Sequence, residues 1–309
     1  MDNQSKIILI AGPTASGKSN FAVKLARKID GEIINADSMQ IYKQLKILTA
    51  RPNKKEQKNI RHHLYGIINI NKNFSTGQWL KLAIIKIKEI RKRKKIPILV
   101  GGTGLYFQSL LNGLVKIPNI SFKIRNKIRL LQKKIGQKKF YKRLLKLDSK
   151  VKKKFDPNDV QRSIRAFEIK THTKISMYDW FKKTKANFHE SAFLKFYINF
   201  ERKKLIQRIE QRTTHMIKEG AIQEVIRFNK AKIKKNHSAK KVIGIEEITK
   251  YLDNRIKLEQ AKELIAIKTR QYAKRQATWA KSRMIMWTKI DPRKFLSVIK
   301  KINKSSLKL

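Results

Sequence analysis

Residues 7–19 read IILIAGPTASGKS, a run of aliphatic side chains that leads into a glycine-containing turn. An apolar run of this length is typical of a strand buried on both faces of a parallel sheet. The turn matches the pattern G-x-x-x-x-G-K-[ST], in which backbone N–H groups and a helix N-terminus surround phosphate groups. This stretch therefore predicts a P-loop fold and a phosphorylated or diphosphorylated ligand.

Two side chains of this turn have specific chemical roles in the pattern. Lys18 is expected to reach the phosphate oxygens, and the hydroxyl of Ser19 is expected to hold Mg²⁺, the cofactor that we predict. The pattern leaves the diphosphate open, so a nucleotide such as ATP is one candidate. The expected diphosphate-binding or nucleotide-binding residues are Gly12, Pro13, Thr14, Ala15, Ser16, Gly17, Lys18 and Ser19.

Further apolar runs occur at residues 32–36, 96–100 and 193–200, and helical patterns occur at 18–29 and 78–94. Strands that alternate with helices indicate an α/β fold with a P-loop NTPase-like parallel sheet flanked by helices. In P-loop ATPases, a later strand usually ends in an aspartate that helps to position Mg²⁺. Here residues 96–100 lead into GGTG instead, which weakens the ATPase interpretation.

The pattern changes after Pro118, where the chain reads as short basic helices up to about residue 185. We therefore expect a core domain at 1–118 and 193–309 and a helical insertion domain at 119–192. The last residues, 289–309, show only weak patterning and carry no structural prediction.

The composition is strongly basic, with 75 Lys and Arg against 22 Asp and Glu and a net charge of +53. Such a charge favours a polyanionic partner, although lysine is frequent everywhere and part of the charge can reflect compositional bias. The chain has no cysteine, which excludes disulfides, thiolate metal sites and cysteine nucleophiles. No apolar run approaches ~18 residues and there is no signal-peptide pattern, so we expect a cytoplasmic protein without a membrane span. We also expect a monomer.

The segment DSMQIYK, residues 37–43, follows the second expected strand. Because parallel strands end at the same edge of a sheet, Asp37 should lie near the phosphate loop. A helix N-cap is the alternative interpretation, since Asp and Ser are favoured there. The segments TARPN at 49–53 and GGTGLY at 101–106 come next along the chain.

Taken together, these segments resemble the tRNA dimethylallyltransferase family, over residues 7 to about 287. The resemblance also includes HHL at 62–64, ND at 158–159, QR at 161–162, TRQYAKRQ at 269–276 and TW at 278–279. It implies that dimethylallyl diphosphate occupies the loop and that the N6 amine of adenosine 37, beside the anticodon, attacks it. A base must be flipped out of its stack for such a reaction.

The resemblance also implies roles for individual residues. Asp37 corresponds to the general base for the attacking amine, Thr103 holds the reacting groups, and Lys18 neutralises the diphosphate. An exocyclic amine is a poor nucleophile, so a carboxylate that accepts its proton lowers the barrier. The resemblance further implies that the insertion domain at 119–192 contacts tRNA. The expected tRNA-binding residues are Asp37, Ser38, Met39, Gln40, Thr103, Arg125, Gln161, Arg162, Ser163, Ile164, Arg165, Arg270 and Lys274.

Spacing offers separate support for some of these contacts. Gln161 and Arg165 lie at i, i+4 on an expected helix, and so do Arg270 and Lys274. A solvated basic face or an ordinary amphipathic helix remains the alternative. His62 and His63 are consecutive, and adjacent histidines do not converge on one metal ion without further ligands. We therefore expect them to have structural or RNA-positioning roles.

Two positions depart from the family pattern: Leu48 stands where the family usually has Gly, and Ile245 where it usually has Tyr. The change at Leu48 affects a turn, and the change at Ile245 affects a helix contact.

Two other functions stay open, a P-loop small-molecule kinase and a non-catalytic RNA-binding protein. The glycine-rich end of residues 96–100 and the high basic charge disfavour the kinase, and Asp37 beside an intact Lys18-Ser19 pair disfavours the non-catalytic protein.

Overall fold

The computed structural model describes residues 5–233 and 237–302. The chain divides into two compact units, one formed by Met1–Ser109 with Phe188–Leu309 and the other by Leu110–Asn187. The helical unit begins nine residues earlier and ends five residues earlier than the insertion expected at 119–192. Each unit is described by itself.

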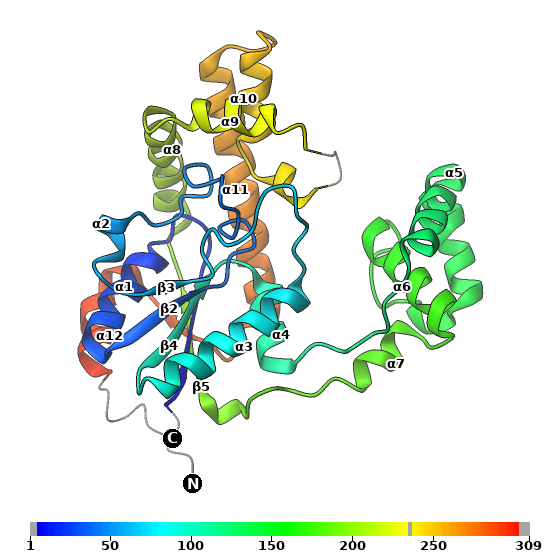
Figure 1. Cartoon of the computed structure of the whole chain (residues 1–309), viewed down its shortest axis with the longest axis horizontal. Helices are drawn as coiled ribbons and strands as arrows, with labels where there is room; N and C mark the ends of the chain where they lie inside the picture. Colours follow the sequence, from blue (N-terminus) through cyan, green and yellow to red (C-terminus); the bar gives the residue numbers. More distant parts are fainter. Residues whose placement is uncertain (1–4, 234–236, 303–309) are drawn as a thin grey trace. The chain divides into compact units, whose positions relative to one another are not determined.

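The first unit contains a six-stranded, entirely parallel sheet in the order β3-β2-β4-β1-β5-β6 (Figure 1). In the register of the sheet, Leu9 of β1 is paired with Leu99 of β4 and with Lys195 of β5. Every residue of β1 and β4 is buried, as expected for inner strands covered on both faces. The strands are β1 Ile7–Ala11, β2 Gly31–Asn35, β3 His62–His63, β4 Ile96–Gly101, β5 Phe193–Ile198 and β6 Thr288–Ile290.

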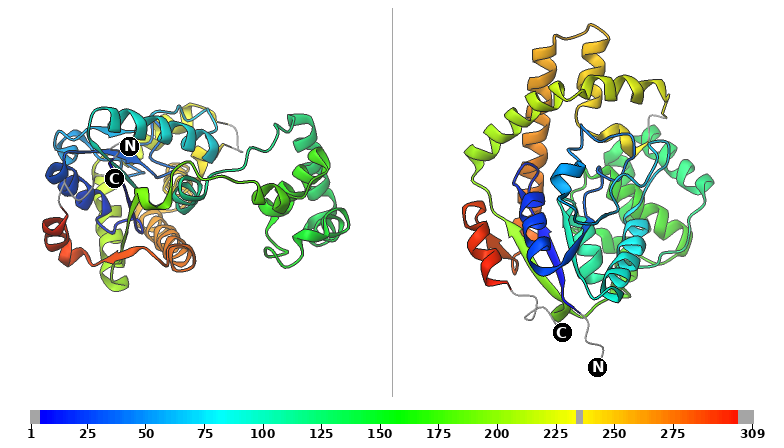
Figure 2. Two further views of the ribbon diagram at one scale, coloured as in Figure 1. Left: turned by 90° about the horizontal axis from the view of Figure 1, so that it is seen from below. Right: turned by 60° about the vertical axis from the view of Figure 1, so that its left-hand side comes forward.

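Helices cover both faces of this sheet (Figure 2). Helices α1 and α12 pack on one face, where the rings of Phe21 and Phe295 lie 4.6 Å apart. Helix α3 carries the fully buried Trp79, whose ring stacks on Tyr106 at 4.2 Å. The helices of this unit are α1 Lys18–Ile29, α2 Lys54–Gln57, α3 Thr76–Lys92, α4 Gly104–Asn112 (which crosses the boundary), α8 Arg202–Lys218, α9 Ala221–Lys230, α10 Ile245–Leu252, α11 Leu258–Arg283 and α12 Phe295–Lys301.

Several boundaries differ from the sequence-based expectation for identifiable reasons. Helix α3 begins two residues earlier than expected because Ser75 and Gln78 form a capping box at its N-terminus. Strand β6 and helix α12 lie in the weakly patterned C-terminal segment, where tertiary contacts to β5 and α1 rather than local periodicity determine the structure.

The second unit is helical (Figure 1). It has its own hydrophobic core. Phe140, Leu144 and Ile169 are fully buried in it. Helix α5 is interrupted at Gly136, which has a φ of 74°. The helices are α5 Phe122–Leu147, α6 Val160–Thr173 and α7 Met177–Lys182. Across residues 5–233 and 237–302, none of the helices combines the length and apolarity that crossing a membrane requires.

Two buried glutamates tie distant segments of the first unit together. Glu224 of α9 accepts the backbone N–H groups of residues 46, 47 and 48 at 2.8 to 3.0 Å and so fixes the turn that carries Leu48. Glu32 of β2 is bonded to His63 of β3 at 2.6 Å and to Arg93 at 2.7 Å. His63 therefore has a structural partner in the sheet.

Replacing Glu32 with Gln should lower the free energy of unfolding by about 1.5–3 kcal/mol at pH 7, the range for hydrogen bonds to charged groups. Burial opposes the charge of Glu32, but the bonds from Arg93 and His63 outweigh it and hold its pKa below the usual value. The stabilisation is therefore present above the unfolded-state pKa near 4.5 and is lost as pH falls through the lower folded-state pKa. Urea unfolding of both proteins from pH 3 to 7 measures this difference, which should shrink toward the acid end. A difference that stays constant with pH would contradict the ionic role.

Candidate active site

The turn between β1 and α1 forms an open phosphate cradle. Gly17 has a φ of 85°, which a side chain would strain. At Gly12 a Cβ atom would lie 2.9 Å from Ser16 Oγ, so the missing side chain makes room for the loop itself. The Ser16 hydroxyl is buried and has no hydrogen-bond partner within the described part of the chain. Lys18 Nζ donates to the carbonyl of Pro13 at 3.2 Å.

Asp37 follows β2 and is held firmly by its neighbours. Its N–H donates to Asn35 Oδ1 and its carbonyl accepts from Asn35 Nδ2, both at 2.9 Å. Asn35 is itself fixed, because its carbonyl accepts the indole N–H of Trp79 at 2.8 Å. The N–H of Met39 donates to Asp37 Oδ1 at 2.9 Å, which forms a local turn rather than a helix cap. The second carboxylate oxygen is therefore available for other chemistry.

Thr103 lies beside this segment because the end of β4 approaches the backbone that follows β2. A Cβ atom at Gly101 would overlap the backbone of Ala36. Thr103 N–H donates to the Ala36 carbonyl at 3.2 Å, and Thr103 Oγ1 accepts the N–H of Ser38 at 2.9 Å. The structure thus brings the predicted residues Asp37, Ser38 and Thr103 together at the edge where β2 and β4 end.

Helix α8 contributes two arginines that the sequence analysis missed. Arg212 Nη1 donates to the hydroxyl of Thr14 at 2.9 Å. Arg208 lies one turn earlier, with Nη1 3.5 Å from the position that a Cβ of Gly17 would occupy. Their i, i+4 spacing was the available signal, but in a chain with 75 Lys and Arg it does not distinguish a site from a solvated face.

The side chain of helix α11 that contacts the cradle is Gln276, and not the expected Arg270 or Lys274. Gln276 Oε1 accepts the N–H of Thr14 at 2.8 Å, and Gln276 Nε2 donates to the Gly102 carbonyl at 3.0 Å. By contrast, Arg270 pairs with Glu210 of α8 at 3.3 Å and Lys274 is exposed. That Arg270 and Lys274 contact tRNA therefore stays a prediction.

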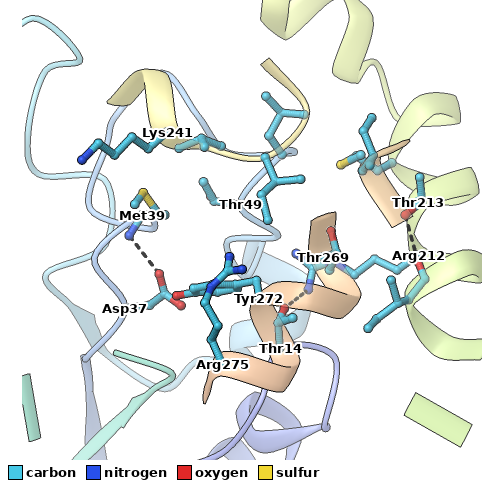
Figure 3. A pocket seen from close by; sticks show the side chains of 16 residues that line it. Thr14, Asp37, Met39, Thr49, Arg212, Thr213, Lys241, Thr269, Tyr272 and Arg275 are labelled. Carbon is cyan, nitrogen blue, oxygen red and sulfur yellow. Dashed lines mark hydrogen bonds between the residues drawn. The ribbon is translucent and has the colours of Figure 1, made fainter. Parts of the chain in front are cut away.

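Two cavities meet at the loop, and both are lined by Thr14, Asp37, Thr49 and Arg212. One has a volume of about 370 Å³ and is lined by Lys18, Ser19 and other polar residues. The second has a volume of about 280 Å³ (Figure 3). Its further lining residues are Met39, Leu48, Ile209, Thr213, Met216, Lys241, Val242, Ile243, Ile265, Thr269, Tyr272 and Arg275.

The charges in this site suit a diphosphate. Burial lowers the pKa of Lys18 to about 8, although the carboxylate of Asp37 opposes the shift and Arg212 adds to it. Burial also lowers the pKa of Arg212, again against the effect of Asp37. Half-buried cations that lack a full counter-charge gain from binding an anion, which would restore the charged form of Lys18.

A magnesium ion fits this donor set only together with a phosphate ligand. Within residues 5–233 and 237–302, no cluster of three or more His, Cys, Asp or Glu side chains could hold a metal alone. Ser19 and Asp37 nevertheless line the same cavity and offer a hydroxyl and a carboxylate. Mg²⁺ commonly takes one or two such protein ligands and completes its shell with water and substrate phosphates.

The remaining predicted residues have varied surroundings. Gln40 Nε2 donates to the carbonyls of Thr49 and Ala50, both at 2.9 Å, so its amide supports the TARP turn. In the second unit, Ser163 is fully buried and bonded to Gln137, which leaves its side chain unavailable to RNA. The other predicted residues there are half-buried Arg125 and Ile164, Arg165 paired with Glu168 at 3.3 Å, and exposed Gln161 and Arg162.

Comparisons with known proteins give a consistent result. A family model described as IPP transferase matches residues 40–283. A curated tRNA dimethylallyltransferase of Pelagibacter ubique (strain HTCC1062) is 69% identical over 100% of this chain and 99% of the relative, and one of Rickettsia massiliae (strain Mtu5) is 43% identical over 91% and 78%.

Two solved structures are also similar. The full-length tRNA isopentenylpyrophosphate transferase of Bacillus halodurans has a TM-score of 0.69 at 31% identity and covers 96% of this chain and 95% of its own. A eukaryotic dimethylallyltransferase acting on tRNA has a TM-score of 0.79 at 32% identity and covers 89% and 70%.

The affinity for inorganic pyrophosphate should fall as pH rises above about 8, because Lys18 then loses its proton in the free protein. Binding should take up a proton in that range, with at most a ~10-fold loss of affinity per pH unit. Calorimetry from pH 7 to 9.5 measures both quantities. Lys18→Arg, which stays charged throughout, is the matched control and corrects for titration of pyrophosphate itself. Equal pH dependence in the two proteins would exclude Lys18 as its source.

Proposed function

This chain belongs to the IPP transferase family, and on that premise we propose that it transfers a dimethylallyl group from dimethylallyl diphosphate to the N6 amine of adenosine 37 in tRNA. The products are N6-isopentenyladenosine and diphosphate. The observation that carries the proposal is that Lys18 and Asp37 line one cavity. A diphosphate-binding cation and a carboxylate base thus face the same space.

At the donor end, the cradle stabilises the leaving group. Lys18 and Arg212 supply positive charge, and the first-turn N–H groups of α1 have no helical partners and can bind phosphate oxygens. As the C–O bond of the donor breaks, negative charge grows on the diphosphate, and pre-oriented cations stabilise it without reorganisation. Mg²⁺ held by the Ser19 hydroxyl and the diphosphate would add charge neutralisation when bound.

At the acceptor end, Asp37 accepts the proton that the amine loses as the C–N bond forms. Met39 N–H occupies one carboxylate oxygen, which directs the other toward the cavity. The hydrogen bonds from Asn35 hold the backbone of Asp37, so the base is in place before substrate arrives. Such orientation contributes to the rate because the reacting atoms must be aligned.

The second cavity protects the reacting group from water. Met39, Leu48, Ile209 and Ile265 give it apolar walls directly beside Asp37. Removing water matters for this reaction because an allylic cation would otherwise be captured by solvent. The arrangement therefore favours transfer to an amine over hydrolysis.

The relatives are named as acting on tRNA, and the basic character of this chain suits that substrate. We expect exposed Gln161 and Arg162 of the second unit to contact RNA. Arg162 pairs with Asp159 at 3.0 Å, whereas Arg165 is engaged with buried Glu168. Mg²⁺ as cofactor, a monomeric state and a cytoplasmic location complete the proposal. Nucleotides such as ATP would then compete for the cradle rather than serve as the donor.

The direct test uses labelled dimethylallyl diphosphate and an unmodified tRNA anticodon stem-loop that contains adenosine 37. We expect the label in one nucleoside, N6-isopentenyladenosine, after digestion of the RNA. A stem-loop with guanosine at position 37 is the matched control, since it lacks the N6 amine. Label at other positions, no transfer, or phosphoryl transfer from ATP would overturn the proposal.

Asp37→Asn should slow the chemical step by about 10²- to 10⁴-fold, the range for a lost general base. The amide preserves the size of the side chain and its bond to Met39 N–H, but it cannot take up the proton. Single-turnover rates with preformed enzyme–tRNA complex isolate this step from binding and product release. Wild-type rates in the variant would show that the turn at Asp37 is only structural.

A further inference from the structure

The side chain of Gln276 links two parts of the site that the reaction must align. Its oxygen accepts the N–H of Thr14 in the cradle, and its nitrogen donates to the carbonyl of Gly102. Both polar ends of the amide are used, so its orientation is determined. If the amide were reversed, donor would face donor and acceptor would face acceptor.

The glycine-rich turn after β4 is shaped to receive this side chain. A Cβ atom at Gly102 would collide with Gln276 Nε2, and one at Gly104 would collide with the ring of Trp279. The two glycines therefore create the space into which α11 inserts. Thr103 lies between them and holds the Ser38 segment through the Ser38 N–H at 2.9 Å.

Tyr272, one helical turn before Gln276, extends this connection toward the base. Burial and the negative charge of Asp37 raise the pKa of Tyr272, while hydrogen bonding to Thr103 and Gln276 opposes the rise. The Tyr272 side chain and Asp37 line the same cavity (Figure 3). One face of α11 thus contacts the donor cradle and the segment that carries the acceptor machinery.

We propose that Gln276 is a positioning residue that sets the alignment between the diphosphate cradle and the Thr103–Ser38–Asp37 segment. The inference rests on the proposed transfer reaction and assigns the amide no direct contact with substrate. A displacement of about 1 Å between reacting groups can cost ~100-fold in rate. Gln276 should therefore affect the chemical step while the binding of each substrate alone stays nearly unchanged.

The first test replaces Gln276 with Leu, which has similar bulk and no hydrogen-bonding groups. We expect the single-turnover rate to fall by about 100-fold, with unchanged affinities for pyrophosphate and for tRNA. Gln271→Leu is the matched control, because Gln271 is exposed on the same helix. A wild-type rate in Gln276→Leu, or a loss carried by the affinities, would overturn the inference.

The variant Gln276→Glu tests the inference independently, even if Gln276→Leu folds poorly. Ionised Glu at position 276 still accepts the Thr14 N–H, but its other oxygen repels the Gly102 carbonyl. A protonated Glu restores both hydrogen bonds, so the rate of Gln276→Glu relative to wild type should rise as pH falls. A ratio independent of pH would overturn the inference, since loss of helix packing alone predicts no such recovery.

A double-mutant cycle tests whether Gln276 acts through its contact with Gly102. Gly102→Ala should displace the amide and slow transfer like Gln276→Leu, and combining the two should add little further loss. Additive losses would overturn the inference. Dimethylallyl transfer by the wild-type protein is measured alongside: its absence would refute the proposed function, whereas normal transfer by wild type and by every variant would refute only the role of Gln276.

Discussion

The close approach of two backbone segments at Gly101 and Ala36 is the constraint on which the site depends. Parallel strands β2 and β4 end side by side, and the main chain after β4 then bonds to Ala36 through Thr103 N–H. A side chain at Gly101 would separate them. Because this contact is made by backbone, it sets the position of Thr103 relative to the segment of Asp37 before any side chain is considered.

The site is then assembled around this edge by elements remote in the sequence. The cradle comes from the first strand–helix turn, Arg212 from α8 and Gln276 from α11. Both side chains contact Thr14: Arg212 donates to its hydroxyl, and Gln276 accepts its N–H. The phosphate loop is therefore a shared surface of four elements, and its geometry reflects the packing of the C-terminal helices as much as its own sequence.

Sequence patterns predicted the parts of this arrangement that are local. The run at residues 7–19 carries its strand, turn and helix start in adjacent positions, and β2, β4 and β5 are apolar enough to be recognised. Strand β3, with two residues, and the segment of β6 and α12 have no comparable pattern, because pairing with β2 and packing on Phe21 determine them. Arg212 and Gln276 were missed for a related reason: their significance lies in partners about 200 or more residues away.

In the helical unit of residues 110–187, the first and last segments of the chain lie close together. A Cβ atom at Gly113 would collide with the carbonyl of Lys185, so the outgoing and returning chain segments run against each other there. For the order of the sheet, the whole unit is thus equivalent to one long loop between β4 and β5. Insertions or deletions in this unit would leave the strand register unchanged, so the unit can evolve to fit a differently shaped RNA while the catalytic unit stays the same.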